Sequence, residues 1–414
     1  MTHIDTGDTA FMLVSAALVL FMTPGLALFY GGLVRSKNVV NTMMMSFVAL
    51  GVVAVQWILA GYSLSFAPGE GVLGTIVGSL DWIGLKGVTS EPNPAYAATI
   101  PHELFMIYQA MFAIITPALI SGAIVERMRF RAYVVFILLW TTFSYDVVAH
   151  WVWGTGGWLK SLGALDFAGG TVVHINAGTS ALVASLVLGP RTGFPHRTAP
   201  PHNVTMALLG GGMLWFGWFG FNAGSALASG ALAANAFVTT NTAAASAMLS
   251  WMLLEIMVKG KPTAVGAITG AVAGLVAITP ACGFVTPLGA ILIGLGVSGI
   301  CYWALNKRIQ WGLDDSLDAF SVHGIGGIFG ALMTGVLATA SVNAGGANGL
   351  LNGNVALFFY QLIAVVATIA YSGGVTFVLL KVLRLTMPLR SEDDHQREGL
   401  DLVEHGEKGY HELS

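Results

Sequence analysis

Two histidines lie inside apolar segments of this sequence. His174 follows Thr-Val-Val, His323 follows Phe-Ser-Val, and glycines come shortly after each. An ionisable side chain at bilayer depth is costly, and it usually faces the interior of a helix bundle or a conduction path. Imidazole can donate and accept hydrogen bonds, and its unperturbed pKa of about 6.5 suits proton exchange near neutral pH. The two residues therefore indicate a path for a small, polar, proton-carrying solute.

An aspartate precedes each histidine. Asp166 comes before His174, and Asp318 comes before His323. Asp166 could bind a cation directly, accept a proton, or cap backbone amides at the start of a helix that we expect near Phe167. The capping position favours a structural and electrostatic role, in which loss of the carboxylate would still be damaging.

The composition is that of a membrane protein. Hydrophobic residues make up 55% of the 414-residue chain and charged residues 9%, whereas a soluble domain carries about 25% charged residues. The net charge of −3 argues against nucleic acid as a partner. Cys282 and Cys301 both lie in apolar segments, so we expect small buried side chains and no disulfide, metal or cofactor site.

Apolar runs of about 20 residues predict the membrane spans. We expect an all-α polytopic membrane protein with eleven transmembrane helices in the lipid bilayer. The predicted spans are 10–32, 41–62, 101–124, 132–153, 167–189, 203–222, 236–257, 264–282, 284–305, 319–338 and 354–383.

The basic residues set the orientation of these spans. If the N-terminus is outside, every one of the 18 Lys and Arg residues except Lys86 and Lys160 falls on the inner side. Cytoplasmic loops carry an excess of Lys and Arg, so the N-terminus is expected outside and the C-terminus inside. The stretch before residue 10 has no basic segment, and we therefore expect no cleavable signal peptide.

The positions of the two histidines suggest an internal repeat. His174 lies in the fifth predicted span and His323 in the tenth. Because five is odd, two consecutive groups of five spans have opposite orientations, which is the inverted-repeat plan with a site near the midplane. The long eleventh span belongs to neither group of five, and we expect it to cover the outside of the bundle. We expect residues 1–385 to form the transmembrane domain and residues 386–414 a polar cytoplasmic tail.

Other charges near the inner side are expected to be structural. Asp314, Asp315 and Asp318 precede the tenth span. We expect them to cap that helix or to pair with inner-loop bases such as Lys307 and Arg308.

Two glutamates are expected in ordinary pairs along a helix. Glu255 has Lys259 four residues later, a spacing that suits a helix pair. Glu126, with Arg127 and Arg129 close by in sequence, is expected to pair in the same way.

Several long motifs, in order, closely resemble those of the ammonium transporters, the Amt/Mep/Rh superfamily, and in particular its bacterial Amt branch. The resemblance covers about residues 10–412. The motifs that carry it are Pro24–Gly32, Asp166–Gly178, Trp218–Ser225, Asp314–Gly324 and the tail segment Gly399–Glu407.

The resemblance implies transport of ammonium or ammonia. An aromatic face attracts a cation by about 0.5–2 kcal/mol, and the positions that match the family's outer recruitment site are Phe112, Trp153 and Ser225, with Asp166 beside them. Phe112 and Phe221 match a pair of stacked phenylalanines, which implies an apolar gate that excludes hydrated ions.

Below this gate the resemblance implies a relay for protons. A bare cation crosses an apolar lumen only at a large cost, so ammonium would be deprotonated and His174 and His323, sharing a hydrogen bond, would line the pore. Whether net ammonia or net ammonium crosses stays open. Tyr108 departs from the phenylalanine of many relatives and could make the outer site slightly more polar.

The resemblance also implies partners and a location. We expect a homotrimer in a bacterial inner membrane, with a regulatory tail and a PII-family protein as a possible partner at the cytoplasmic face. One alternative is an ammonium sensor that signals through its tail with little flux. An enzyme acting on membrane substrates fits poorly, because the two histidines have no nucleophile, metal cluster or paired carboxylates beside them.

Overall fold

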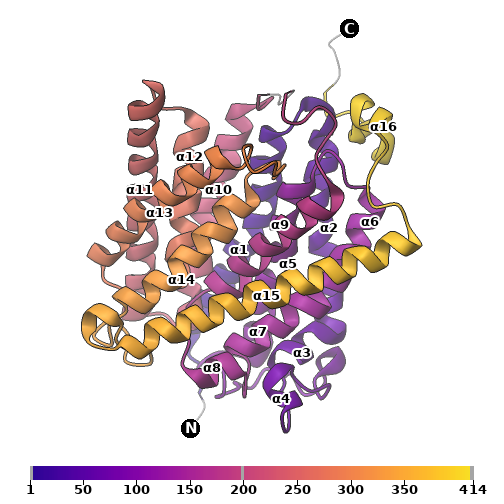
Figure 1. The fold of residues 1–414 in the computed structure, drawn as a ribbon. Coiled ribbons are helices and arrows are strands. Elements are labelled where there is room, and N and C mark those ends of the chain that lie inside the picture. The colour runs from indigo at the N-terminus through magenta and orange to yellow at the C-terminus, as the bar shows by residue number, and fades with distance from the viewer. Residues whose placement is uncertain (1–2, 197–199, 411–414) are drawn as a thin grey trace.

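A computed structural model describes residues 3–196 and 200–410. Figure 1 shows that the described chain is a bundle of helices. The extended pairings among the described residues are two isolated bridges, Asn93 with Ala97 and Met128 with Arg390. The prediction of an all-α protein is confirmed.

Ten helical segments among the described residues are long and apolar enough to cross a membrane. They are α1 (Thr6–Leu33); η1 (Ser36–Asn38), α2 (Val39–Gln56), η2 (Trp57–Gly61) and α3 (Tyr62–Phe66); α5 (His102–Ile124); α6 (Phe130–Trp140), η4 (Thr141–Tyr145), α7 (Asp146–Trp153) and α8 (Trp158–Leu162); η5 (Gly170–Ile175) and α9 (Asn176–Leu188); α10 (Val204–Ala223) and η6 (Gly224–Ala226); α11 (Ala231–Lys259); α13 (Pro287–Lys307); η7 (Phe320–Gly324) and α14 (Ile325–Leu337); and α15 (Val355–Thr386).

The remaining predicted span, the eighth (264–282), is a shorter helix, α12 (Ala264–Ile278). Nearly all of its residues are buried among other helices, so α12 is part of the bundle interior. The remaining short elements are α4 (Leu73–Ile76), η3 (Ile83–Leu85), η8 (Leu350–Asn352), α16 (Asp393–Glu398) and η9 (Asp401–His405).

Short polar side chains mark where many of these helices begin. The side chain of an N-cap residue accepts a hydrogen bond from a first-turn amide that has no partner within the helix. Such caps are Asp5 for α1, Asn203 for α10, Thr263 for α12 and Thr286 for α13. Pro287 follows the last of these caps in the first turn of its helix, where a missing amide proton costs nothing.

The arrangement follows the inverted-repeat plan. In Figure 1 the N- and C-termini lie at opposite ends of the bundle, as an odd number of crossings requires, and α15 runs obliquely across the outside. The first helices of the two repeats, α1 and α10, pack closely. A Cβ added to Gly210 on α10 would lie 2.2 Å from the backbone nitrogen of Phe29 on α1, so glycine permits this approach.

Candidate functional site

The two histidines meet at the centre of the bundle. His174 lies in η5 and His323 in η7, which are both π-helical turns that lead into an α-helix of 13 residues. Their Nδ1 atoms are 3.3 Å apart, and the side chains are 1% and 4% exposed. One Nδ1 donates to the other, so one Nε2 is left as a donor and the other as an acceptor. The pair therefore presents both functions that a proton relay needs.

Glycines allow the two π-helical turns to approach. A Cβ added to Gly178 would lie 2.2 Å from the backbone nitrogen of Gly324, and one added to Gly327 would lie 3.0 Å from the Cβ of His174. Gly178 and Gly327 each lie four residues after a histidine. Glycines at matching positions of the two repeats therefore permit their close packing at this point.

Asp166 caps the first of these turns. Its Oδ1 accepts hydrogen bonds from the amides of Gly169 (2.8 Å) and Gly170 (2.7 Å). Its Oδ2 accepts from Thr171 (2.7 Å) and Val172 (3.1 Å). The helical turn begins at Gly170, so the predicted start near Phe167 is wrong by about one turn, because Gly169 adopts a left-handed conformation (φ 116°).

The counterpart of Asp166 in the second repeat is Asp315, and the prediction of Asp318 is wrong. Asp315 lies eight residues before His323, as Asp166 lies eight residues before His174. Its carboxylate accepts hydrogen bonds from three backbone amides at the start of η7. These amides belong to Ala319 (2.9 Å), Phe320 (2.8 Å) and Ser321 (3.3 Å).

The two capping carboxylates are both buried but have different charged neighbours. Burial raises the pKa of Asp166, and its four backbone hydrogen bonds oppose that rise. Burial and the nearby charge of Asp318 raise the pKa of Asp315, while Arg308 and backbone amides oppose the rise. The charge of Asp166 is thus stabilised by backbone dipoles alone and that of Asp315 by Arg308 and backbone dipoles together, while the oxygens of both are occupied by the helix that each caps.

The four residues expected at the outer recruitment site line one cavity. This outer cavity has a volume of about 230 Å³, and its walls include Phe112, Trp153, Asp166 and Ser225. The indole nitrogen of Trp153 donates to the carbonyl oxygen of Asp166 (2.9 Å), and the Phe112 ring meets the indole edge-on with centroids 6.0 Å apart. The Ser225 hydroxyl donates to the Phe221 carbonyl (2.8 Å), which leaves its oxygen lone pairs available.

Tyr108 contacts the residues that position Ser225 in this site. Its hydroxyl lies 2.9 Å from the carbonyl oxygens of Gly220 and Phe221 and 3.2 Å from the hydroxyl of Ser225. The side chain is fully buried. The hydroxyl that distinguishes Tyr108 from phenylalanine is thus engaged with the end of α10.

Two phenylalanines separate the outer cavity from the histidines. The rings of Phe112 and Phe221 are tilted by 39° with centroids 4.2 Å apart, and both side chains are 1% exposed. Below them, a narrow cavity of about 10 Å³ is lined by apolar side chains and the two histidines, and a single water molecule needs about this much room. Trp218, quoted in the sequence only as part of a motif, stacks on His174 at 5.5 Å.

An inner cavity continues the line toward the cytoplasm. It has a volume of about 180 Å³, and Phe29, Val272 and His323 line both this cavity and the narrow one above it. Asp318 and Arg308 lie in its wall and form an ion pair, as predicted. The three cavities together trace a discontinuous path from one side of the bundle to the other.

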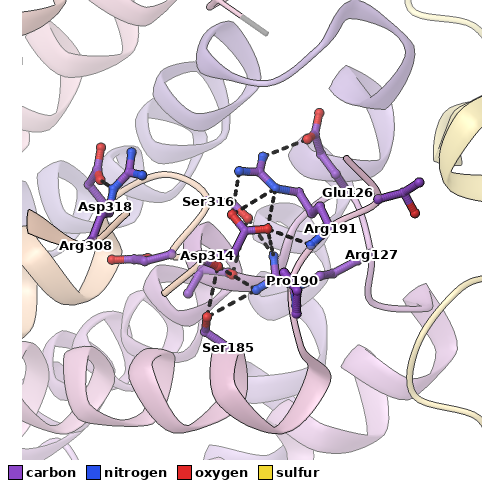
Figure 2. A network of polar contacts seen from close by, with 12 residues as sticks. Glu126, Arg127, Ser185, Pro190, Arg191, Arg308, Asp314, Ser316 and Asp318 are labelled. Carbon is purple, nitrogen blue, oxygen red and sulfur yellow. Dashed lines mark hydrogen bonds and ion pairs between the residues drawn. The ribbon is translucent and has the colours of Figure 1, made fainter. Parts of the chain in front are cut away.

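Buried charges join the inner loops in a single network, shown in Figure 2. Glu126 pairs with Arg35 and Arg191 at 2.8 Å each, and Arg191 also pairs with Asp314 at 2.7 Å. Arg127 donates to the backbone carbonyl of Asp314 (2.7 Å). The local pairing predicted for Glu126 with Arg127 and Arg129 is therefore wrong, because Glu126 lies at a positive φ of 68° that turns it away from the helix.

The charge of Glu126 is strongly stabilised. Burial alone would raise the pKa of Glu126, but Arg191 and Arg35 lower it to about 2. Asp314 pairs with an inner-loop base, as expected, but that base is Arg191 and not Lys307 or Arg308. The predicted pair of Glu255 and Lys259 is present at 3.3 Å.

The tail docks on the same inner loops. The Asn38 side chain donates to Glu126 (2.9 Å) and accepts from the amide of Leu400 (2.8 Å). The amide of Asn41 donates to the Asp401 carboxylate (2.8 Å). Asn38 thus connects the buried charge network directly to the tail.

One buried acid had no expected role. Asp146 on α7 is fully buried, and its carboxylate accepts from the Gln56 side chain (2.7 Å). Within the described residues it has no ion-pair partner, and it does not line the three cavities.

Comparison with known proteins agrees with this geometry. A model described as Ammonium Transporter Family matches residues 10–410. The chain belongs to this family. It is 52% identical over 405 residues to an ammonium transporter of Bacillus subtilis, covering 98% of both chains. It is 47% identical over 404 residues to ammonium transporter Amt1 of Archaeoglobus fulgidus, covering 98% of this chain and 99% of that protein.

Solved structures of family members have the same fold. A crystal structure of Saccharomyces cerevisiae Mep2 matches with a TM-score of 0.88 at 36% identity, covering 95% of this chain and 90% of that chain. A protein described as Sensor Amt Protein matches with a TM-score of 0.88 at 28% identity, covering 96% of this chain and 98% of that chain. The chain is therefore a multi-pass membrane protein of a transporter family and not of an enzyme family.

Proposed function

We propose that this protein transports ammonium across the membrane, recruiting the ion at the outer cavity and passing it inward past the two histidines. The observation that carries the proposal is the line of three cavities, with an aromatic site at one end and paired imidazoles at its narrowest part. Membership of the ammonium transporter family supports the same substrate.

Recruitment follows from the walls of the outer cavity. Aromatic faces attract a cation through their quadrupoles, and Phe112 and Trp153 supply two such faces at 86° to each other. The hydroxyl oxygen of Ser225 can accept a hydrogen bond from an ammonium N–H. Asp166 acts as a positioning residue. Its carboxylate holds the start of η5, and its backbone carbonyl orients the Trp153 indole.

Selection follows from the two phenylalanines. A cation with its hydration shell does not fit between rings 4.2 Å apart, and a cation without that shell pays a large desolvation cost in an apolar lumen. Loss of a proton removes most of this cost. The species that passes the gate in this proposal is ammonia.

The proton that ammonium loses is accepted by water in the outer cavity, passes through water at the gate to the paired imidazoles, and then moves along them separately from ammonia. An Nε2 that accepts and an Nε2 that donates lie at the two ends of the pair, and His174 Nε2 has no hydrogen-bond partner among the described residues. It therefore faces the narrow cavity free to exchange a proton. Ammonia leaving past His323 enters the inner cavity, where water can protonate it again.

A sensor with little flux is the second candidate. One structural neighbour is described as a sensor, at 28% identity, whereas curated relatives at 47–52% identity are described as ammonium transporters. The homotrimer, the PII-family partner and the bacterial inner membrane stay predictions from the family resemblance.

Uptake into proteoliposomes tests the proposed function. Purified protein in vesicles with an internal pH dye should accelerate the response to external ammonium several-fold over protein-free vesicles, and the rate should saturate. Phe221→Trp, which fills the gate, should reduce this uptake. A rate no higher than that of empty vesicles would favour the sensor.

A further inference from the structure

The wall of the outer cavity contains a positively charged side chain. Lys160 on α8 lines the same cavity as Trp153 and Asp166. Its ammonium nitrogen lies 5.7 Å from the centroid of the Tyr96 ring and donates to the carbonyl oxygen of Trp153 (3.0 Å). This group has the same charge and the same kind of N–H donor as ammonium, the ion that the cavity is proposed to recruit.

The Tyr96 ring is held rigidly for this contact. Its hydroxyl accepts a hydrogen bond from the amide of Thr155 (3.0 Å) and donates to the carbonyl oxygen of Phe66. Its ring stacks on Phe105 with centroids 4.9 Å apart at 16°. Tyr96 and Phe105 are both in the wall of the outer cavity. Tyr96 therefore offers a preorganised aromatic face outside the Phe112–Trp153 site.

The charge of Lys160 is not neutralised locally. The Asp166 carboxylate in the same cavity accepts four backbone amides. Within the described residues, Lys160 has no carboxylate within ion-pair distance. Its positive charge therefore acts on any second cation that enters the cavity.

We propose that Lys160 is a tethered competitor that sets the affinity of the outer cavity for ammonium. Its ammonium group occupies a second cation-binding surface, the face of Tyr96, and repels the incoming ion. The inference rests on the proposed function, since it concerns the recruitment step of that transport. Lys160 is therefore a determinant of affinity at the recruitment step, because its charge repels the incoming cation.

Removal of the charge should increase apparent affinity. Coulomb repulsion between unit charges across such a cavity in water corresponds to about a two- to five-fold change in binding. Lys160→Met should lower the KM for ammonium uptake by this factor and leave the maximal rate within about two-fold, because the gate and the histidines are untouched. The difference should shrink at high ionic strength, where exposed charges are screened.

Matched variants separate charge from structure. Lys86→Met removes the other outer lysine, which is exposed on the same side but does not line the cavity, and should not lower KM. Lys160→Arg keeps the charge and should not show the decrease. Lys160→Gln is neutral but can still donate to a carbonyl, so it should lower KM as Lys160→Met does.

A double variant tests whether the Tyr96 face is a second cation-binding surface. Adding Tyr96→Leu to Lys160→Met should cancel part of the affinity gain, since the vacated aromatic face would no longer hold ammonium. An unchanged or raised KM in Lys160→Met, with saturable uptake by the native protein, would overturn the inference and leave the proposed function standing. A raised KM that Lys160→Gln restores would assign Lys160 to support of the Trp153 carbonyl. Absence of saturable uptake by the native protein would overturn both.

Discussion

At the scale of single residues, two buried polar side chains beside the proposed path hold backbone in place and are not free to act on a solute. Both oxygens of Asp166 are occupied by amides, and Tyr108 is committed to the end of α10. His174 differs, because its Nε2 is buried without a partner among the described residues. His174 is also the only one of these three residues that lines the narrow cavity on the proposed path, so its free nitrogen is available to the solute.

Asp166→Asn tests the capping role. An amide side chain has one accepting oxygen, so two of the four backbone amides would lose their partner, and hydrogen bonds to a charged group are worth about 1.5–3 kcal/mol each. We expect a clear drop in the melting temperature and at least a ten-fold loss of ammonium uptake. Native stability together with native uptake would contradict the assignment. Asp315→Asn, the matched change in the second repeat, should behave alike.

Glu126→Gln tests the buried charge network. The pKa of Glu126 is lowered from 4.5 to about 2 in the folded protein. Each ten-fold change in proton affinity is worth about 1.4 kcal/mol, so the charge contributes on the order of 3 kcal/mol. Because the folded pKa is depressed, this stability is present above about pH 4.5 and is lost as the pH falls toward 2.

Melting temperatures from pH 7 to pH 3 provide the measurement. The difference between native protein and Glu126→Gln should be largest near neutral pH and should shrink below about pH 4.5. Glu70→Gln, an exposed glutamate on the outer side, is the control and should change little. A difference that grows as the pH falls would contradict the account.

At the scale of elements, the two repeats use the same construction. Each has an aspartate that caps a π-helical turn, a histidine in that turn and a glycine four residues later. The sequence predicted the histidines and the repeat, because membrane-embedded ionisable groups are rare. It did not identify Asp315 as the counterpart of Asp166, although the equal eight-residue spacing was a usable signal. Asp318 lies closer to His323 in the sequence and was predicted in its place. The sequence does not show which of the two carboxylates faces the backbone amides, whereas the structure does.

Gly178→Ala tests the close approach of the repeats. Its Cβ would lie 2.2 Å from the backbone nitrogen of Gly324, so one of the π-helical turns must shift. We expect less folded protein and a loss of most ammonium uptake. Gly374→Ala on α15 is the matched control, because no atom of the described part of the chain lies within 4 Å of its added Cβ. If both variants transported like the native protein, the packing account would be wrong.

At the scale of the whole molecule, the inner loops and the tail form one connected surface. Arg191 links Glu126 to Asp314, and Asn38 links Glu126 to the tail. The sequence predicted the spans and their orientation well, since hydropathy and basic-residue bias act locally along the chain. It could not predict these partners, because the joined residues come from loops far apart in sequence.

Asn38→Ala tests this connection. Both bonds of its side chain would be lost, so the tail should detach more often and trypsin should cleave after the exposed Arg397 several-fold faster. Asn306→Ala is the control, since among the described residues that side chain bonds only to Tyr302 within α13. An unchanged cleavage rate in Asn38→Ala would mean that other contacts hold the tail.

The central claim is that the paired histidines, which lie below the apolar gate, carry the proton of ammonium inward separately from ammonia. It is tested by recording the current across proteoliposome membranes after a sudden rise in external ammonium, for native protein and for His174→Ala. The account predicts a transient inward current in the native protein and its loss in the variant, with both proteins equally folded. A current of native size in His174→Ala, or uptake by the native protein without current, would contradict a proton relay through this pair.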